Sequence, residues 1–234
     1  MSLKSNDQCP VQIPMGVVTL DGDLCLPEDA RGVVIFAHGS GSSRFSLRNR
    51  YVAQALRKEG LGTLLFDLLT KDEETEDMQT AHLRFDIELL AERLVSATDW
   101  VKVNPVTVSL KIGYFGASTG AAAALVAAAE RPDVIGAIVS RGGRPDLAKG
   151  ALSRVTAPTL LIVGGDDSPV IGMNSEAFHM LQAKKKMVII PGATHLFEEP
   201  GALEEVSRLA VKWFVEHLAR KPNSHKKVKQ NGTE

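Results

Sequence analysis

The sequence predicts an α/β fold, with a mostly parallel sheet, helices on both faces and an antiparallel hairpin at the start. Six short apolar runs rich in β-branched residues are continuous rather than alternating, which is typical of strands covered on both faces. Helical stretches separate these runs, and such alternation favours parallel strands. The runs are Val33–Ala37, Thr63–Phe66, Ile112–Phe115, Val134–Val139, Thr159–Val163 and Met187–Ile190.

The hairpin is predicted from an Asp-Gly pair near the N-terminus. Asp21 and Gly22 stand between two short strand-like runs, Gly16–Leu20 and Asp23–Leu26. Glycine accepts the positive φ that a two-residue turn requires, so this pair predicts the turn of the hairpin.

Five helices and one domain are predicted. No repeat or linker interrupts residues 11–220, which predicts a single domain there, between a disordered N-terminus (1–10) and a disordered polar tail (221–234). About 19 residues separate the fourth and fifth apolar runs, so we expect no cap domain between them. The helices are Leu47–Glu59, His82–Val101, Thr119–Glu130, Met173–Ala183 and Ala202–Arg220.

The composition is that of a soluble globular protein. The chain has 234 residues, 44% hydrophobic and 24% charged, with a formal net charge of -1. That balance creates no field that attracts nucleic acid or an anionic membrane, so neither is expected as a partner. Two cysteines, no secretory signal and no long apolar run predict a cytoplasmic protein without a disulfide framework.

The strongest functional motif is GASTG at residues 116–120. It matches G-x-S-x-G, directly follows the run Ile112–Phe115 and opens the helix Thr119–Glu130. A sharp strand-to-helix turn lifts the serine hydroxyl above the sheet, and the glycines avoid collisions there. A bare match is common by chance, but this strand–turn–helix context predicts Ser118 as a nucleophile.

A second motif, HGSGSS, occupies residues 38–43 after the run Val33–Ala37. Its glycines let the chain bend beneath a substrate carbonyl. The backbone N–H groups of Ser40 and Thr119 are therefore predicted to form an oxyanion hole. The alternative is a phosphate-binding glycine loop, but the pattern G-x-x-x-x-G-K-[ST] is absent.

Two further polar groups follow strands near the C-terminus. Asp166 and Asp167 come after the run Thr159–Val163, and His195 comes after Met187–Ile190. Each alone has a plainer interpretation, a helix-capping aspartate or a hydrogen-bonded loop histidine. Their joint arrangement with Ser118 at successive strand ends, in the chain order Ser, Asp, His, favours a catalytic role.

On these residues the chain resembles the α/β-hydrolase superfamily, and within it the small dienelactone-hydrolase-like enzymes. The resemblance covers about Gly16 to Arg220 and rests on HGSGSS, GASTG, VGGDDSPV and GATH. The superfamily's acid often stands in G-x-x-D-x-x-V, which here favours Asp167, with Asp166 as the alternative. Dienelactone hydrolases carry a cysteine at the elbow. Ser118 departs from that pattern, which argues against a dienelactone substrate and leaves ester hydrolysis.

The resemblance implies a single-domain α/β-hydrolase fold and a serine hydrolase that needs no cofactor or metal. Ser118 would attack a small-molecule carboxylic ester or lactone and form an acyl-enzyme. His195 would act as base and Asp167 would orient it. Thioester or peptide hydrolysis, acyl transfer and a non-catalytic binding protein remain open. The edge strands of an open sheet also leave a homodimer open.

Three residues are candidates for substrate binding. Arg44 and Arg141 lie in loops near strand ends, where either could hold an anionic group of the substrate. The alternative is arginines that are solvated or paired within the protein. Leu68 could form a wall of the acyl site or an ordinary part of the core. The acidic run Lys71–Asp77 is better interpreted as a solvated loop than as a cation site.

Overall fold

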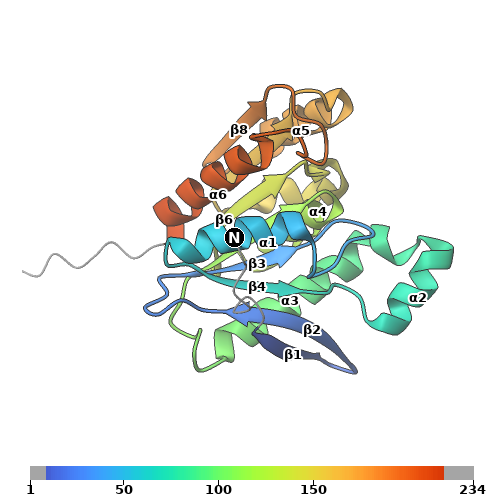
Figure 1. Cartoon of the computed structure of the whole chain (residues 1–234). Coiled ribbons are helices and arrows are strands. Elements are labelled where there is room, and N and C mark those ends of the chain that lie inside the picture. The colour runs from blue at the N-terminus through green and yellow to red at the C-terminus, as the bar shows by residue number, and fades with distance from the viewer. Residues whose placement is uncertain (1–8, 219–234) are drawn as a thin grey trace, which may run out of the picture.

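A single sheet of eight strands organises the computed structural model, which describes residues 9–218 (Figure 1). The strand order is β1-β2-β4-β3-β5-β6-β7-β8; β1 and β2 run antiparallel to their neighbours and the other pairs are parallel. The predicted architecture is therefore confirmed. The strands are β1 Pro10–Met15, β2 Val18–Cys25, β3 Val33–Ala37, β4 Gly62–Phe66, β5 Ile112–Ala117, β6 Ile135–Arg141, β7 Thr159–Gly164 and β8 Lys185–Ile190.

Helices cover both faces of the sheet. One face packs against α1 and α6, and the other packs against α3, α4, α5 and the 3₁₀ segment η2. Two apolar cores result, one on each side. The helices are α1 Leu47–Lys58, α2 Lys71–Thr80, α3 Ile87–Val103, α4 Thr119–Glu130, α5 Ser168–Met180 and α6 Ala202–Leu218, with 3₁₀ segments η1 Leu83–Phe85 and η2 Pro145–Arg154.

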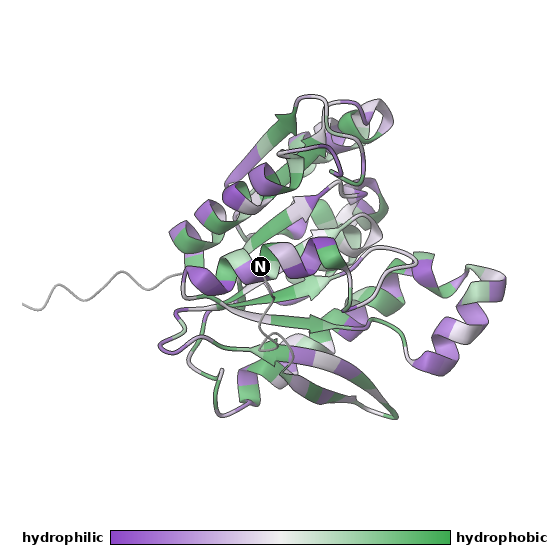
Figure 2. Cartoon of the chain, in the orientation of Figure 1, coloured by the Kyte–Doolittle hydropathy of each residue, from purple (hydrophilic) through white to green (hydrophobic). Residues whose placement is uncertain are grey.

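Burial along the strands follows their place in the sheet. Every residue of β3, β4, β5 and β7 is buried, as the continuous apolar runs predict, and Figure 2 shows these strands as mainly hydrophobic. Strand β8 is different: it lies at the edge and is mostly half-buried or exposed. The expectation of cover on both faces is wrong for β8, because the helices do not bury the faces of this edge strand completely.

The N-terminal hairpin is present, but its turn lies elsewhere. Strands β1 and β2 pair from Pro10 opposite Asp23 to Met15 opposite Val18, so the turn falls at Gly16, whose φ is +66°. The prediction of a turn at Asp21 and Gly22 is wrong, since both lie inside β2. Position 22 requires a glycine because β2 packs closely against β4 at that point. A Cβ on Gly22 would lie 3.1 Å from the Cβ of Phe66 in β4.

The acidic run is a helix rather than a loop. Helix α2 begins after Thr70, whose side chain accepts from the Glu73 N–H while the Glu73 carboxylate accepts from the Thr70 N–H. This reciprocal capping box stabilises a helix start that has no apolar stripe to anchor it. Helix α5 also begins earlier than predicted, at Ser168 rather than Met173.

Helix α3 begins at Ile87 rather than at the predicted His82, because the separate 3₁₀ segment η1 occupies residues 83–85. Apart from the start of α5, the other boundaries after the hairpin agree with the sequence to within three residues. Within residues 9–218, only the short η2 segment lies between β6 and β7, so no cap domain is inserted there. Pro10, placed in the N-terminal segment by the sequence, already belongs to β1. Residues 1–8 and 219–234, which include the predicted tail, lie outside the described residues. No helix in the described part of the chain is long and apolar enough to cross a membrane.

Candidate active site

Ser118 occupies a strained turn between β5 and α4. Its φ of 50° and ψ of −120° lie in a region that favours glycine, and it stands at the N-cap of α4 without making a side-chain capping bond. The flanking glycines make the turn possible. A Cβ on Gly116 would lie 2.4 Å from the Cα of Ala121, and one on Gly120 would lie 2.2 Å from the Ala37 carbonyl oxygen. The G-x-S-x-G spacing is therefore a steric requirement of this turn.

His195 and Asp167 meet above the ends of β7 and β8. The His195 Nδ1 lies 2.7 Å from Oδ2 of Asp167, whose side chain is 13% exposed. Asp167 is the N-cap residue of α5, yet its carboxylate makes no capping bond and contacts the imidazole instead. Asp166 contributes only its backbone N–H, which donates to the Ala193 carbonyl at 3.0 Å. The structure thus brings Asp167, rather than Asp166, to the histidine.

The segment 141–144 lies between Ser118 and His195. The Ser118 N–H donates to the Arg141 carbonyl at 3.3 Å, and the Arg144 N–H donates to the Ser118 carbonyl at 3.1 Å. A Cβ on Gly142 would lie 3.5 Å from Cε1 of His195. One loop after β6 therefore contacts both residues. The Ser118 hydroxyl and the imidazole are not hydrogen-bonded here, and in free enzymes such bonds are often long until substrate binds.

His38, in the loop after β3, connects two loops at the candidate site, and sequence analysis did not single it out. Its Nε2 accepts from the Leu68 N–H at 3.0 Å, so Nδ1 carries the proton and donates to the Gly39 carbonyl at 3.0 Å. Burial lowers the pKa of His38, against the hydrogen bond to Gly39 and the charge of Asp67. The neutral ring joins the loop after β3 to the loop after β4. Its position before the first glycine of HGSGSS is the signal that could have found it.

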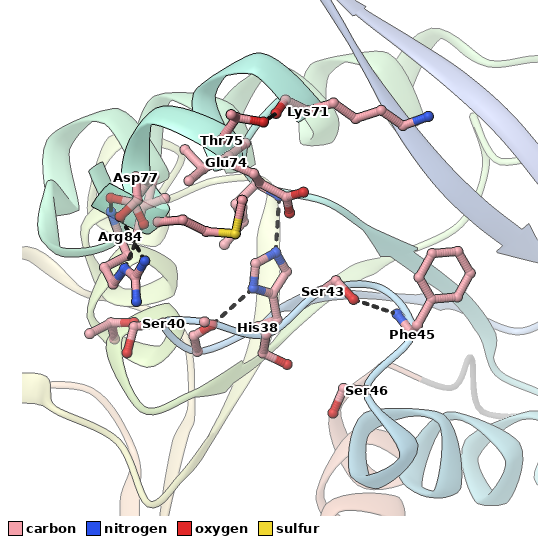
Figure 3. A pocket seen from close by; sticks show the side chains of 18 residues that line it. His38, Ser40, Ser43, Phe45, Ser46, Lys71, Glu74, Thr75, Asp77 and Arg84 are labelled. Carbon is pink, nitrogen blue, oxygen red and sulfur yellow. Dashed lines mark hydrogen bonds and ion pairs between the residues drawn. The ribbon is translucent and has the colours of Figure 1, made fainter. Parts of the chain in front are cut away.

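A cavity of about 660 Å³ opens next to Thr119, the residue that follows Ser118 (Figure 3). Its lining includes Ser40 and Thr119, the two residues whose N–H groups the sequence proposes for an oxyanion hole. Gly39 approaches Ser118 closely, since a Cβ on it would lie 3.1 Å from the Ser118 Cβ. The apolar part of the lining comes from Phe45, Leu68, Leu69, Met78 and Leu90.

Helix α2 and η1 supply a charged side of the same cavity. Arg84 is fixed by Asp77, which accepts from its Nε at 2.5 Å and from its backbone N–H at 3.0 Å. The hydrogen bonds and charge of Arg84 hold the pKa of the Asp77 carboxyl below its usual range, against the effect of burial. Nearby, burial and the charge of Asp67 raise the pKa of Glu74. Sequence analysis assigned no binding role to Glu74, Asp77 or Arg84, because it interpreted Lys71–Asp77 as a solvated loop and placed Arg84 in an ordinary helix.

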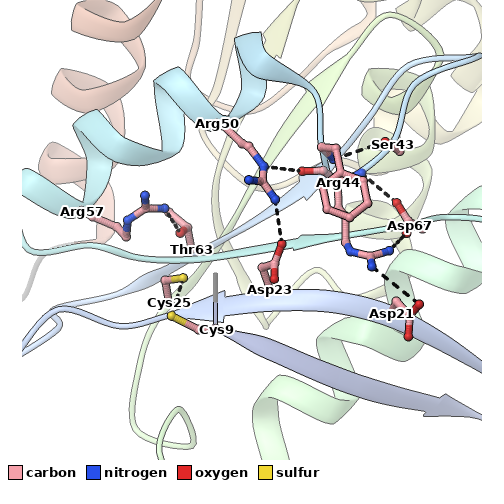
Figure 4. A network of polar contacts seen from close by, with 11 residues as sticks. Cys9, Asp21, Asp23, Cys25, Ser43, Arg44, Arg50, Arg57, Thr63 and Asp67 are labelled. Carbon is pink, nitrogen blue, oxygen red and sulfur yellow. Dashed lines mark hydrogen bonds and ion pairs between the residues drawn. The ribbon is translucent and has the colours of Figure 1, made fainter. Parts of the chain in front are cut away.

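The two arginines named from the sequence lie outside the cavity lining. Arg44 forms an ion pair with Asp67 and lies 3.6 Å from Asp21 (Figure 4). Arg141 is 8% exposed, and its Nε and Nη1 have no hydrogen-bond partner. Burial, and to a lesser degree the charge of Arg48, lowers its pKa to about 10. Its Cζ lies 6.0 Å from the centre of the Phe197 ring.

The fold and the placement of these residues define an α/β hydrolase. The family model of the dienelactone hydrolases matches residues 20–222. The chain therefore belongs to the dienelactone hydrolase family.

Solved structures agree with this assignment. The dienelactone hydrolase from Anabaena variabilis is 62% identical, has a TM-score of 0.88, and covers 90% of this chain and 100% of its own. An α/β serine hydrolase homologue from Coxiella burnetii shares the fold at 19% identity, with a TM-score of 0.73 over 91% of this chain and 99% of its own.

A curated relative is named differently. A protein of Mycobacterium tuberculosis called a putative phosphoribosyl transferase is 56% identical over 208 residues, which is 89% of this chain. Those residues make up 46% of the relative, so this chain spans less than half the length of that protein.

Proposed function

We propose that this chain is a serine hydrolase that cleaves a carboxylic ester or lactone of a small molecule through an acyl-enzyme. The observation that carries the proposal is the 2.7 Å contact between His195 and Asp167 at strand ends beside the strained Ser118 turn. A serine hydroxyl needs a base, and a histidine oriented by a carboxylate is the side chain suited to that task.

The chemistry proceeds in two halves. The Ser118 oxygen attacks the ester carbonyl while His195 Nε2 takes its proton, and Asp167 holds the Nδ1–H and stabilises the imidazolium. His195 then protonates the leaving alcohol. In the second half His195 deprotonates a water molecule, which attacks the acyl-enzyme and releases the acid.

The oxyanion of each tetrahedral intermediate is assigned to the Ser40 and Thr119 N–H groups. The Thr119 N–H belongs to the first turn of α4, where no helical acceptor exists, and both residues line the cavity. Donors fixed before the reaction stabilise developing charge without reorganisation.

The apolar side of the cavity is assigned to the acyl group. Leu68 belongs to this wall together with Leu69 and Leu90. The proposal requires neither Arg44 nor Arg141, because Arg44 is held by Asp67 and Arg141 is buried near the Phe197 ring. An anionic substrate group held by either arginine stays a prediction, as do the cytoplasmic location and a homodimer.

Phosphoribosyl transfer is not proposed for this chain. The aligned 208 residues carry the hydrolase fold and form 46% of the M. tuberculosis relative.

The test is burst kinetics on a short-chain p-nitrophenyl ester. We expect a burst of one p-nitrophenolate per protein followed by slower turnover, because p-nitrophenolate leaves in acylation and an activated ester makes deacylation the slower step. Ser118→Ala should abolish both phases. A folded wild-type protein without ester turnover would contradict the proposal. Faster turnover of a matched thioester or peptide would replace the substrate class while retaining the mechanism.

A further inference from the structure

The two cysteines of the chain lie side by side at one end of the hairpin. Cys9 precedes β1, Cys25 ends β2, and their Sγ atoms are 2.7 Å apart (Figure 4). The pairing of the strands brings them together, because the Leu24 N–H donates to the Cys9 carbonyl at 2.8 Å. A disulfide bond is about 2.05 Å long, so a small side-chain movement would close one.

The two thiols differ in exposure, and burial affects the more enclosed one. Cys25 is 5% exposed, whereas Cys9 is half-buried. Burial, then the hydrogen bond to Cys9 and the charge of that sulfur, raise the pKa of the Cys25 thiol to about 12. The Cys25 S–H donates to the Cys9 sulfur. Cys9 is therefore the thiol suited to meet an oxidant first.

We propose that Cys9 and Cys25 form a site of reversible thiol–disulfide exchange that takes a low-molecular-weight disulfide of the glutathione type. The Cys9 thiolate attacks one sulfur of the small disulfide, its S–S bond breaks, and one small thiolate leaves. Cys25 then loses its proton to solvent and attacks the Cys9 sulfur, which expels the second small thiolate. The protein gives up two electrons and two protons, and one disulfide becomes two thiols.

The cysteine pair lies at the opposite end of the strands from Ser118. Strand β2 runs antiparallel to β4, so Cys25 pairs with Thr63 near the start of β4. The cavity-lining Leu68 follows the other end of that strand, on the side where β5 delivers Ser118. We therefore expect the cross-link to stabilise the hairpin without altering ester hydrolysis.

The experiment treats the full chain with oxidised glutathione and then blocks remaining thiols with iodoacetamide in denaturant, because Cys25 is buried in the native protein. Intact mass and peptide maps are measured. The wild type should lose the mass of two hydrogens, resist alkylation and yield a peptide joining Cys9 to Cys25. Cys25→Ser should stop at one glutathione adduct on Cys9, and Cys9→Ser should remain alkylatable at Cys25. Alkylation of both cysteines in the treated wild type, or a lasting glutathione adduct on it, would overturn the proposal.

Urea unfolding measures the consequence independently of any hydrolase activity. The cysteines stand 16 positions apart, and closing that loop restricts the unfolded chain. The unfolding midpoint should rise on oxidation and return after dithiothreitol. Cys9→Ser, treated identically, should show no shift. An unchanged or lower midpoint in a cross-linked wild type would contradict the stabilising role.

Discussion

The imidazole of His195 and the carboxylate of Asp167 meet at 2.7 Å although they stand 28 positions apart and follow different strands. Strands β7 and β8 are adjacent and parallel, so the loops that follow them emerge side by side. A Cβ on Gly164, at the end of β7, would lie 2.4 Å from the Ala193 carbonyl oxygen, which shows how closely the two loops approach. The contact is thus a direct product of the sheet topology.

Asp167→Asn should reduce kcat for ester hydrolysis by about 10⁴-fold, because an amide no longer selects the imidazole tautomer that accepts the serine proton. Asp166→Asn is the matched control: its side chain lacks this contact, and we expect near wild-type kcat. Steady-state kinetics with one ester measures both. Equal losses in the two variants would contradict the role given to Asp167.

Ser118→Gly should be more stable than Ser118→Ala by about 1 kcal/mol, because only glycine tolerates a φ of 50° with a ψ of −120° without strain. Both variants should lack activity. Urea unfolding compares them directly. If the alanine variant is equally stable, the turn is not strained in solution.

The stability of the protein should fall as pH drops below about 6.5, partly through His38. Burial lowers the pKa of His38 in the folded state, so the unfolded chain binds a proton that the folded chain refuses. The contribution of His38 to the free energy of unfolding is fully present above the pKa that His38 has in the unfolded chain. It is lost as the pH falls from there through the pKa of His38 in the folded protein. His38→Gln cannot be protonated and should show a shallower decline of the thermal midpoint between pH 7.5 and 5. If the thermal midpoints of the wild type and of His38→Gln decline equally with pH, groups other than His38 cause the loss of stability.

Arg141→Met should raise the free energy of unfolding by roughly 1–3 kcal/mol, because it removes buried donors that have no acceptor. Arg144→Met is the control, since its guanidinium is paired with Asp146 and we expect no gain. Urea unfolding of the two variants and the wild type measures this difference in the free energy of unfolding.

The Arg141→Met and Arg144→Met variants should also be assayed with a neutral ester and a carboxylate-bearing ester. A selective rise in KM for the anionic ester with Arg141→Met would place this arginine in the substrate site.

The elements that deliver the candidate site were predictable because each lies where an apolar strand ends. Buried strands leave a clear sequence pattern, and parallel strands end at one edge, so Ser118, Asp167 and His195 all follow strands at that edge. The strain at Ser118 could also be anticipated, since GASTG requires glycines on both sides of a sharp turn.

Other features were not visible because tertiary contacts decide them. Gly22 was interpreted as a turn residue, but its missing Cβ lets β2 approach Phe66. Helix α2 has almost no buried side, so hydrophobic periodicity could not reveal it; the Thr70–Glu73 capping box was the available signal. The pairing of Arg84 with Asp77 depends on that helix and was missed with it.

The central claim is that Ser118 is an activated nucleophile, and the direct measurement is intact mass after exposure to a fluorophosphonate probe. The account predicts one phosphonyl adduct on the wild type, mapped to Ser118, and none on Ser118→Ala. No adduct on a folded wild-type protein, or an adduct that persists in the alanine variant, would contradict it.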